Sequence, residues 1–193
     1  MKFFISDTYK EWYGTRFPAM GLEHFPCHYY YMTPVQQQML IENYKNGVPL
    51  PEGYYFDKAD VEKDAQVILN TWRHAASGDL ETTKAKLQRM PNSLVREKQR
   101  NEAISFELVD LSGFMNHLFT LPEHRNKGIG SAVETDLCIK LIKEGIVPYK
   151  DVETFNKSVL AASEKSKYWT RWNSANDEPI LVNFYKHVFK TPN

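Results

Sequence analysis

The sequence predicts an α+β fold in which a mostly antiparallel sheet is flanked by helices. Apolar residues recur at helical spacing before Pro91, and segments with strand character replace them from Leu94 to Thr120. A glycine-containing turn and a long amphipathic helix follow this stretch. Separate runs of helices and antiparallel strands are typical of α+β domains, and 193 residues are enough to bury a core.

The composition argues against several classes of protein. The 24 Lys and Arg residues balance 24 Asp and Glu, so the net charge is 0 and no overall field favours nucleic acid as a partner. The chain lacks the roughly 20-residue apolar run of a membrane span and the apolar core of a signal peptide. Cys27 and Cys138 offer neither a disulfide framework nor metal-ligand spacing. We therefore expect an intracellular protein, cytoplasmic or mitochondrial and not secreted, with no metal and no membrane partner.

Aromatic residues concentrate at the N-terminus, where the first 31 residues hold 10 of the 26. This density fits either a ligand surface or a segment that packs on the main core or on a partner subunit. Burial is the main use of aromatic area, which favours packing. The sequence leaves open whether this segment forms a homodimer.

Three helices are predicted in the first half of the chain. The first starts at residues 33–36, where Thr, Pro and Gln occupy the cap, first and third helical positions, and it should end near Gly47. The third runs from Asp79 to Met90, because Pro91 stops it. The second begins near Asp60 and has four residues at helical spacing: Val61, Ala65, Ile68 and Trp72.

The next stretch has the period of strands separated by short polar turns, which predicts an antiparallel meander. Its strands are Leu94–Arg96, Ala103–Val109 and Phe114–Thr120. The elements predicted after it are a helix from Ser131 to Glu144 closed by Gly145, a strand Ile146–Val152, a helix from Asn156 and a strand near Ile180–Val188.

The turn before the Ser131 helix has the pattern of an anion site. Gly128 and Gly130 let a backbone approach a ligand closely at a helix N-terminus, whose amides and dipole favour phosphate. Arg125 and Lys127 add positive charge there. The turn lacks the Lys-Ser/Thr of a P-loop, and it follows a meander rather than the first strand of a dinucleotide fold.

The residues around this turn resemble a known family. Arg125-x-x-Gly128-x-Gly130, after strand Leu118–Thr120 and Pro122, resembles the pyrophosphate motif of the GNAT acyltransferases, and the glycine N-acyltransferase family is more similar still. The shared features run in order from Gly53 to Trp172: the Trp72 helix, Pro91, Ser105-Phe106, Asp110-x-x-Gly113, Thr120-Leu121-Pro122-Glu123-x-Arg125, Pro148-Tyr149, Asn156 and Trp169-x-x-Trp172.

The resemblance implies a domain organisation and a GNAT-like fold. Residues 53–193 would form the acyl-CoA-binding catalytic domain, and residues 1–52 a shortened remnant of the family's N-terminal half. The sheet would be splayed, with strands Phe114–Thr120 and Ile146–Val152 diverging around the pantetheine arm of CoA.

The resemblance also implies roles for individual residues. The backbone of Phe119 and Thr120 would pair with pantetheine, near which Asn156 would also lie. The amide of Leu118 would donate to the thioester oxygen. Amides of one continuous run, with Ser131, would hold the pyrophosphate, namely those of Arg125, Asn126, Lys127, Gly128, Ile129 and Gly130.

Two positions depart from the family pattern. The family's general base, a Glu near the start of the strand that enters the cleft, is Phe114 here, and the Tyr that often serves as general acid is Ser163. His117 lies on the same strand and is the candidate substitute base. Strand alternation points His117 away from the cleft face, a β-bulge would reverse this, and a structural histidine is the alternative.

Other side chains have plainer interpretations. Glu107 and Glu153 are expected to be solvated surface carboxylates, and Cys138 a buried core thiol. Trp169 and Trp172 either border the acceptor pocket or anchor the C-terminal segment on the core.

The expected function is acyl transfer from acetyl-CoA or another acyl-CoA to an amine, with a small amino acid such as glycine as acceptor. Direct attack by the amine is expected, because no residue has the pattern of a nucleophile beside its base. Two alternatives stay open: a non-catalytic acyl-CoA-binding pseudoenzyme that lacks the Glu base, and an enzyme that acylates a protein or peptide amine.

Overall fold

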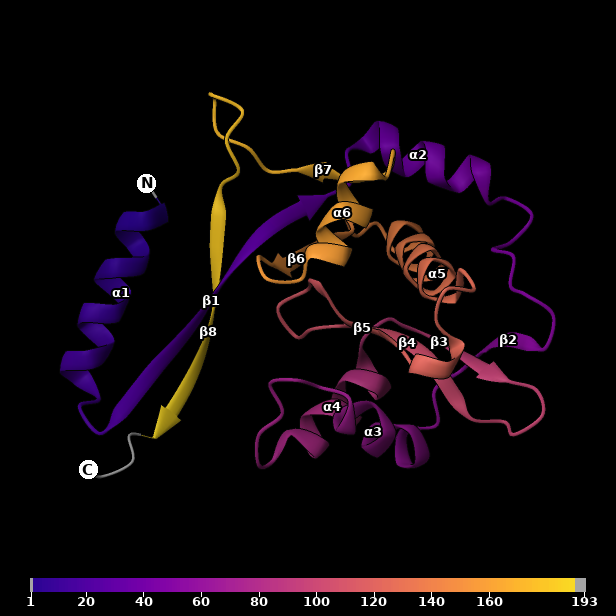
Figure 1. Ribbon diagram of the computed structural model, residues 1–193, viewed down its shortest axis with the longest axis horizontal. Helices are drawn as coiled ribbons and strands as arrows, with labels where there is room; N and C mark the ends of the chain where they lie inside the picture. The colour runs from indigo at the N-terminus through magenta and orange to yellow at the C-terminus, as the bar shows by residue number, and fades with distance from the viewer. Residues whose placement is uncertain (1, 190–193) are drawn as a thin grey trace. The chain divides into compact units, whose positions relative to one another are not determined.

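The computed structural model describes residues 2–189, with side chains from residue 8 to residue 186. These residues form two compact units (Figure 1). One is Met32–Lys150, and the other combines the chain up to Tyr31 with the chain from Asp151 onward. This division follows contacts, whereas the boundary at residue 52 follows the family resemblance and stays a prediction. No helix within residues 2–189 is long and apolar enough to cross a membrane.

The first helix of the Met32–Lys150 unit begins where the sequence predicts. α2 (Pro34–Asn43) is capped by Thr33, whose hydroxyl accepts a hydrogen bond from the Gln36 amide, while the Gln36 side chain accepts one from the Thr33 amide. This reciprocal pair satisfies two backbone donors at the helix start. The helix ends earlier than predicted, and Gly47 lies in the turn that follows it, at φ 97°.

Four consecutive antiparallel strands form the sheet of this unit, in the order β2–β3–β4–β5. Their bounds are Tyr54–Asp57, Asn92–Glu97, Ala103–Val109 and Met115–Thr120. The meander from β3 to β5 confirms the sequence prediction. The edge strand β2 is missing from that prediction, because its short aromatic run directly follows a connector rich in Pro and Gly.

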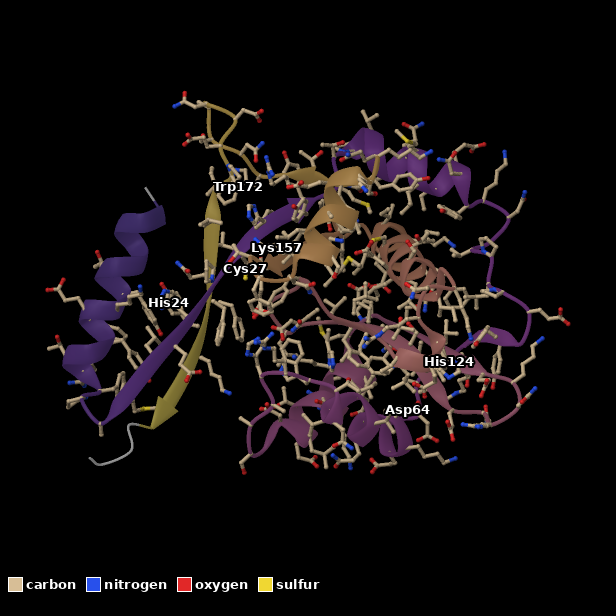
Figure 2. The ribbon with its side chains drawn as sticks, in the orientation of Figure 1. His24, Cys27, Asp64, His124, Lys157 and Trp172 are labelled. Atoms are coloured by element: carbon tan, nitrogen blue, oxygen red, sulfur yellow. The ribbon has the colours of Figure 1, made fainter. Side chains whose placement is uncertain are left out.

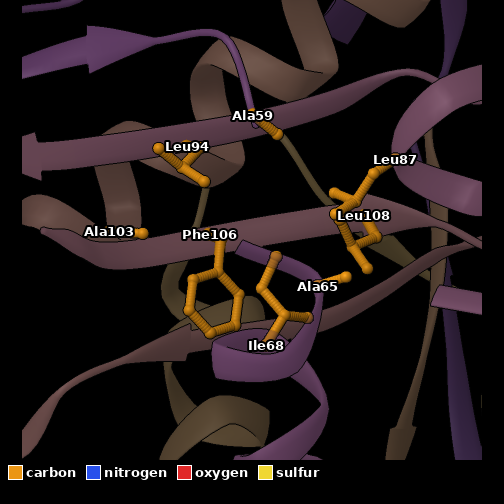
Figure 3. Close-up of a cluster of buried hydrophobic side chains, with 8 residues drawn as sticks. All are labelled: Ala59, Ala65, Ile68, Leu87, Leu94, Ala103, Phe106 and Leu108. Carbon is orange, nitrogen blue, oxygen red and sulfur yellow. The ribbon is translucent and has the colours of Figure 1, made fainter. Parts of the chain in front are cut away.

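One face of this sheet is covered by α3 (Val61–Asn70) and α4 (Asp79–Arg89) (Figure 1). Both helices confirm the prediction, and Asp60 caps α3 by accepting from the amides of its first turn. Trp72 lies just beyond the end of α3. The helices and the sheet share a buried apolar cluster, shown in Figure 3: Ala59, Ala65, Ile68, Leu87, Leu94, Ala103, Phe106 and Leu108.

The other face is covered by α5 (Ile129–Lys143), which the sequence also predicts (Figure 1). Ile129 and Val133 of α5 pack against Val95 and Ile104 of the sheet in a second buried cluster. β6 (Tyr149–Glu153) follows, and its parallel pairing with β5 has a single register pair, Met115 with Lys150. The sheet is therefore mixed, mostly antiparallel, and flanked by helices, as predicted.

The second unit is built on a long antiparallel ribbon of β1 and β8, which pair from Met20–Phe189 to His28–Leu181. Rings of the N-terminal segment pack within this unit, with the Tyr9 ring centroid 5.5 Å from that of Tyr185, while Trp12 stays 56% exposed. Packing thus accounts for part of the aromatic segment. The elements are α1 (Lys2–Arg16), β1 (Met20–Tyr31), α6 (Lys157–Lys165), β7 (Thr170–Arg171) and β8 (Leu181–Phe189).

Candidate functional site

The turn between β5 and α5 contains the residues predicted to bind an anion. A short 3-10 helix, η1 (Pro122–His124), opens it. Asn126 and Gly128 then adopt positive φ angles of 59° and 77°, so the backbone reverses before α5 begins at Ile129. Because α5 is capped by glycine, no side chain occupies its N-terminal amides. Unpaired amides at the positive end of a helix dipole form an anion-binding geometry.

Gly130 lets α5 start directly against the end of β5. A Cβ at this position would lie 3.1 Å from Thr120 Oγ1, which shares a 2.7 Å hydrogen bond with Ser105 Oγ on β4. A larger residue would therefore crowd Thr120 Oγ1, which would have to shift by a few tenths of an ångström. The glycine sets how closely the turn approaches Thr120, one of the residues predicted to pair with pantetheine.

Both cations of the turn are exposed yet anchored. Arg125 Nε donates to the carbonyl oxygen of Thr120 at 2.9 Å, and its guanidinium lies 5.3 Å from the ring centroid of Phe119. Lys127 Nζ donates to the Tyr54 hydroxyl on β2 at 2.9 Å. The predicted pyrophosphate residues thus form one continuous turn that carries two positive charges and adjoins the end of β5.

A β-bulge interrupts the pairing of β4 with β5 next to this turn. Phe106 pairs with Phe119 and Leu108 with Asn116, so His117 and Leu118 together lie opposite the single residue Glu107. His117 has the left-handed angle φ 61°. Bulges re-aim strand residues beside active sites. This bulge falls at the residue whose amide is predicted to donate to the thioester oxygen.

The two bulge residues turn to opposite faces of the sheet. Leu118 packs in the α5-side cluster. The His117 ring lies on the α3–α4 side, where its Nε2 shares a 2.9 Å hydrogen bond with Thr71 Oγ1 and its centroid is 4.7 Å from that of Trp72. Burial lowers the pKa of His117 to about 4, so the imidazole is neutral and weakly basic at neutral pH. These contacts favour the structural alternative for His117.

Glu107 is not the solvated surface carboxylate that the sequence predicts. It is 2% exposed on the α5 side, because β4 is buried on both faces. Burial, and then the Glu134 carboxylate of α5, raise the pKa of Glu107 well above its usual range, whereas the nearby Lys150 lowers it. Cys138 of α5 is fully buried, which raises the pKa of its thiol and confirms the prediction of a core cysteine.

An open groove of about 480 Å³ lies along the C-terminal half of α5, with Asp136, Lys140 and Glu144 in its lining. The predicted anion site is at the opposite end of this helix. Among the side chains described, residues 8–186, no group of three or more His, Cys, Asp or Glu could hold a metal ion.

Comparison with solved structures identifies the architecture. A Drosophila protein matches 96% of this chain and 57% of its own with a TM-score of 0.75 at 13% identity. A GCN5-related N-acetyltransferase from Sphaerobacter thermophilus matches 97% of this chain and 58% of its own with a TM-score of 0.55 at 11% identity. This is the GNAT fold.

A second GCN5-related structure extends the comparison. A GCN5-related N-acetyltransferase-like protein from Streptococcus suis matches 96% of this chain and 67% of its own, with a TM-score of 0.52 at 16% identity. The chain spans less than two thirds of the length of the Drosophila and Sphaerobacter proteins. No protein-family model and no curated protein sequence matches it.

Phe114 lies just before β5, where the resemblance predicts the Glu that serves as general base in the family. Its ring is half-buried, and its centroid is 6.5 Å from that of Tyr149. The Tyr149 hydroxyl donates to the carbonyl oxygen of Ser112 at 2.7 Å and closes the tight turn before Phe114. An aromatic pair therefore occupies the position of the expected carboxylate.

The remaining predicted residues lie in the other unit. Asn156 precedes α6, and its side-chain oxygen accepts a 3.2 Å hydrogen bond from Ser158 rather than from a helix amide. Ser163, at the position of the frequent GNAT general acid, is 2% exposed. Trp169 is 7% exposed, and the Trp172 amide donates to the Tyr29 carbonyl, contacts that agree with the anchoring alternative (Figure 2).

Two residues beside the turn were not predicted from the sequence. Tyr54 and His124 share a 2.9 Å hydrogen bond, and His124 is 7% exposed at the end of η1 (Figure 2). They are 70 positions apart in the chain, and no motif links them. The available signal was the Tyr54-Tyr55-Phe56 run itself, whose aromatic residues favour a strand.

Proposed function

We propose that this chain is an acyl-CoA-dependent N-acyltransferase, similar to the glycine N-acyltransferases, that acylates a small amino acid such as glycine. The observation that carries the proposal is the glycine-capped turn before α5, which adjoins the end of β5 and its bulge. The GNAT fold supports it. Acylation of a protein or peptide amine is the alternative within the same reaction class.

In this proposal the turn binds the pyrophosphate of CoA. The amides from residue 125 to residue 130, with Ser131, donate to phosphate oxygens, and the charges of Arg125 and Lys127 add attraction. Arg125 already uses its Nε on the Thr120 carbonyl, so its remaining N–H groups are those free to reach phosphate. The backbone of Phe119 and Thr120 would hold the pantetheine arm.

The chemical step is direct attack of the amine nitrogen on the thioester carbonyl. The Leu118 amide donates to the developing oxyanion, the C–N bond forms, the C–S bond breaks and the thiolate leaves with the electron pair. The proton lost by the amine passes to solvent or to the thiolate. Direct attack is supported by Cys138, because a fully buried thiol with a raised pKa is a poor nucleophile.

A test of binding compares two substitutions at Gly128. Asp and Asn both tolerate the positive φ of 77° at this position better than other side chains do, and they have the same shape. Gly128→Asp adds a negative charge to the anion site, so we expect it to bind CoA at least ~10-fold more weakly than Gly128→Asn does, by calorimetry. Equal affinities of the two variants would contradict a phosphate site here.

A second candidate function is a non-catalytic acyl-CoA-binding protein. Phe114 favours it, because a positioned base is worth about 10²–10⁴ in rate and no carboxylate stands there. An acceptor amine with a pKa near 10 is about one part in a thousand deprotonated at neutral pH. A slow enzyme should therefore speed up as the pH rises.

The two candidates are separated by thiol release from acyl-CoAs with glycine, glutamine and peptide amines. If the chain is an enzyme, we expect Phe114→Glu to raise the rate near neutral pH by about 10-fold or more, with Phe114→Gln as the uncharged control. CoA binding without thiol release from the wild type, even at about pH 9, would establish the binding protein instead.

A further inference from the structure

Three polar side chains from different elements meet beside the anion-binding turn. Tyr54 lies on β2, His124 ends η1, and Lys127 lies in the turn itself. The Tyr54 hydroxyl is 2.9 Å from His124 Nδ1 and 2.9 Å from Lys127 Nζ. The Lys127 ammonium also lies 5.5 Å from the centroid of the Tyr54 ring.

The Lys127 ammonium fixes the direction of one of these hydrogen bonds, and the Glu123 carboxylate favours a direction for the other. An ammonium only donates, so the Tyr54 oxygen accepts from Lys127. His124 Nε2 lies 4.0 Å from Glu123 Oε1, which favours the tautomer with its proton on Nε2, and in that tautomer Nδ1 accepts from the Tyr54 O–H. The chain of hydrogen bonds therefore runs from Lys127 through Tyr54 to His124. Lys127 keeps two further N–H groups that can donate to an anion.

Tyr54 is held firmly enough to hold another residue. Its ring packs against the buried cluster of Val95, Ile104, Ile129 and Val133, and its ring and that of His124 meet edge to face at 5.6 Å. Its backbone pairs with Glu97 of β3. A lysine that is free in solution samples many rotamers, and ordering it on binding lowers affinity. Contact with a fixed hydroxyl removes part of that penalty before a ligand arrives.

We propose that Tyr54 is a positioning residue that presents Lys127 to a phosphate of the ligand, with His124 fixing the direction of the Tyr54 hydroxyl. This inference rests on the proposed function for the identity of the ligand as CoA. Tyr54 does not touch the ligand in this arrangement. Its effect on affinity therefore passes entirely through the Lys127 ammonium.

The test is a double-mutant cycle on CoA affinity, measured by calorimetry. Tyr54→Phe keeps the ring and its contact with the ammonium but removes the hydroxyl. We expect it to weaken CoA binding about fivefold, the size expected for freeing one long side chain. Lys127→Met should weaken binding about tenfold, and adding Tyr54→Phe to Lys127→Met should change nothing further.

Two controls separate positioning from folding. Tyr55→Phe is the same substitution one residue later, where the hydroxyl bonds to Asn101 instead, and it should leave CoA affinity unchanged. Pantetheine, which has no phosphate, should bind the wild type and Tyr54→Phe equally. A thermal melt of each variant verifies that it is folded.

The outcomes distinguish this inference from the proposed function. An unchanged affinity in Tyr54→Phe, or an equal loss in the wild-type and Lys127→Met backgrounds, overturns the positioning role while leaving the CoA site intact. Absence of CoA binding by the wild type overturns the proposed function and this inference together. A loss confined to the wild-type background, and to ligands that carry phosphate, supports the inference.

Discussion

The two faces of the β2–β5 sheet each bury one ionisable side chain at the bulge between β4 and β5. On the α3–α4 face, burial lowers the pKa of His117 to about 4. On the α5 face, burial and the Glu134 carboxylate raise the pKa of Glu107 well above its usual range. One group is a base and the other an acid, yet burial shifts both pKa values toward the uncharged form, because desolvation disfavours whichever form carries charge.

The difference between the two residues lies in their partners. His117 has a hydrogen bond to Thr71 that suits its neutral form. Glu107 has one carboxyl oxygen, Oε2, with no hydrogen-bond partner among the described residues, and the adjacent Lys150 is paired with Glu134. A satisfied buried group stabilises its surroundings, whereas an unsatisfied one weakens them. The comparison teaches that burial sets the direction of each pKa shift, and partners set whether the group stabilises the fold.

The larger expected effect is the acid dependence that comes from His117. Between the reference histidine pKa of ~6.5 and about pH 4, His117 binds a proton in the unfolded chain but not in the folded chain. Stability from this group is therefore full above that range and is lost as the pH falls through it, by at most about 3 kcal/mol. Asn tolerates the left-handed backbone at this position. We expect the free energy of unfolding of His117→Asn, measured in urea, to change less with pH over this range than that of the wild type.

The comparison between His117→Asn and the wild type has an internal reference. Above about pH 7 the free energy of unfolding of the variant should differ from that of the wild type by a constant amount, because the contacts with Trp72 and Thr71 are lost. Profiles that stay parallel down to about pH 4 would show that His117 is charged in the folded state. It would then be a stronger base than its burial indicates.

The smaller expected effect has the opposite sign and comes from Glu107. A raised folded pKa means that the folded chain holds its proton more tightly, so stability is full below the unfolded pKa of ~4.3 and falls as the pH rises. Glu107→Gln keeps the shape and removes the titration. We expect the variant to melt about 2 °C above the wild type at about pH 8, a shift that corresponds to roughly 0.5–1 kcal/mol.

The exposed Glu102 provides a control for this prediction, because it lies in the turn before β4 and Glu102→Gln removes the same formal charge. The melting temperature of Glu102→Gln should depend on pH in the same way as that of the wild type. If Glu107→Gln instead lowered the melting temperature at every pH, Glu107 would be an ionised partner of Lys150, and the two faces of the sheet would not be comparable.

Local signals predicted most elements of the Met32–Lys150 unit. The Thr33 cap, the Asp60 cap and Pro91 act within one turn of their own position, so the sequence alone places the helices that they bound. The aromatic segment lacked such signals, and α1 and β1 were missed because their rings follow no helical or strand period. The ribbon that stabilises them joins residues more than a hundred positions apart.

The sequence by itself also determined the turn from Arg125 to Ser131, because glycine spacing and a helix start are local properties of the backbone. The tertiary structure alone decided which pKa values shift and which side chains meet. Burial raises the pKa of Glu107 because β4 is covered on both faces, and Lys127 contacts Tyr54, which lies on a strand 73 positions earlier. Burial and long-range contacts depend on how distant segments pack, and that information is not contained in the spacing of neighbouring residues.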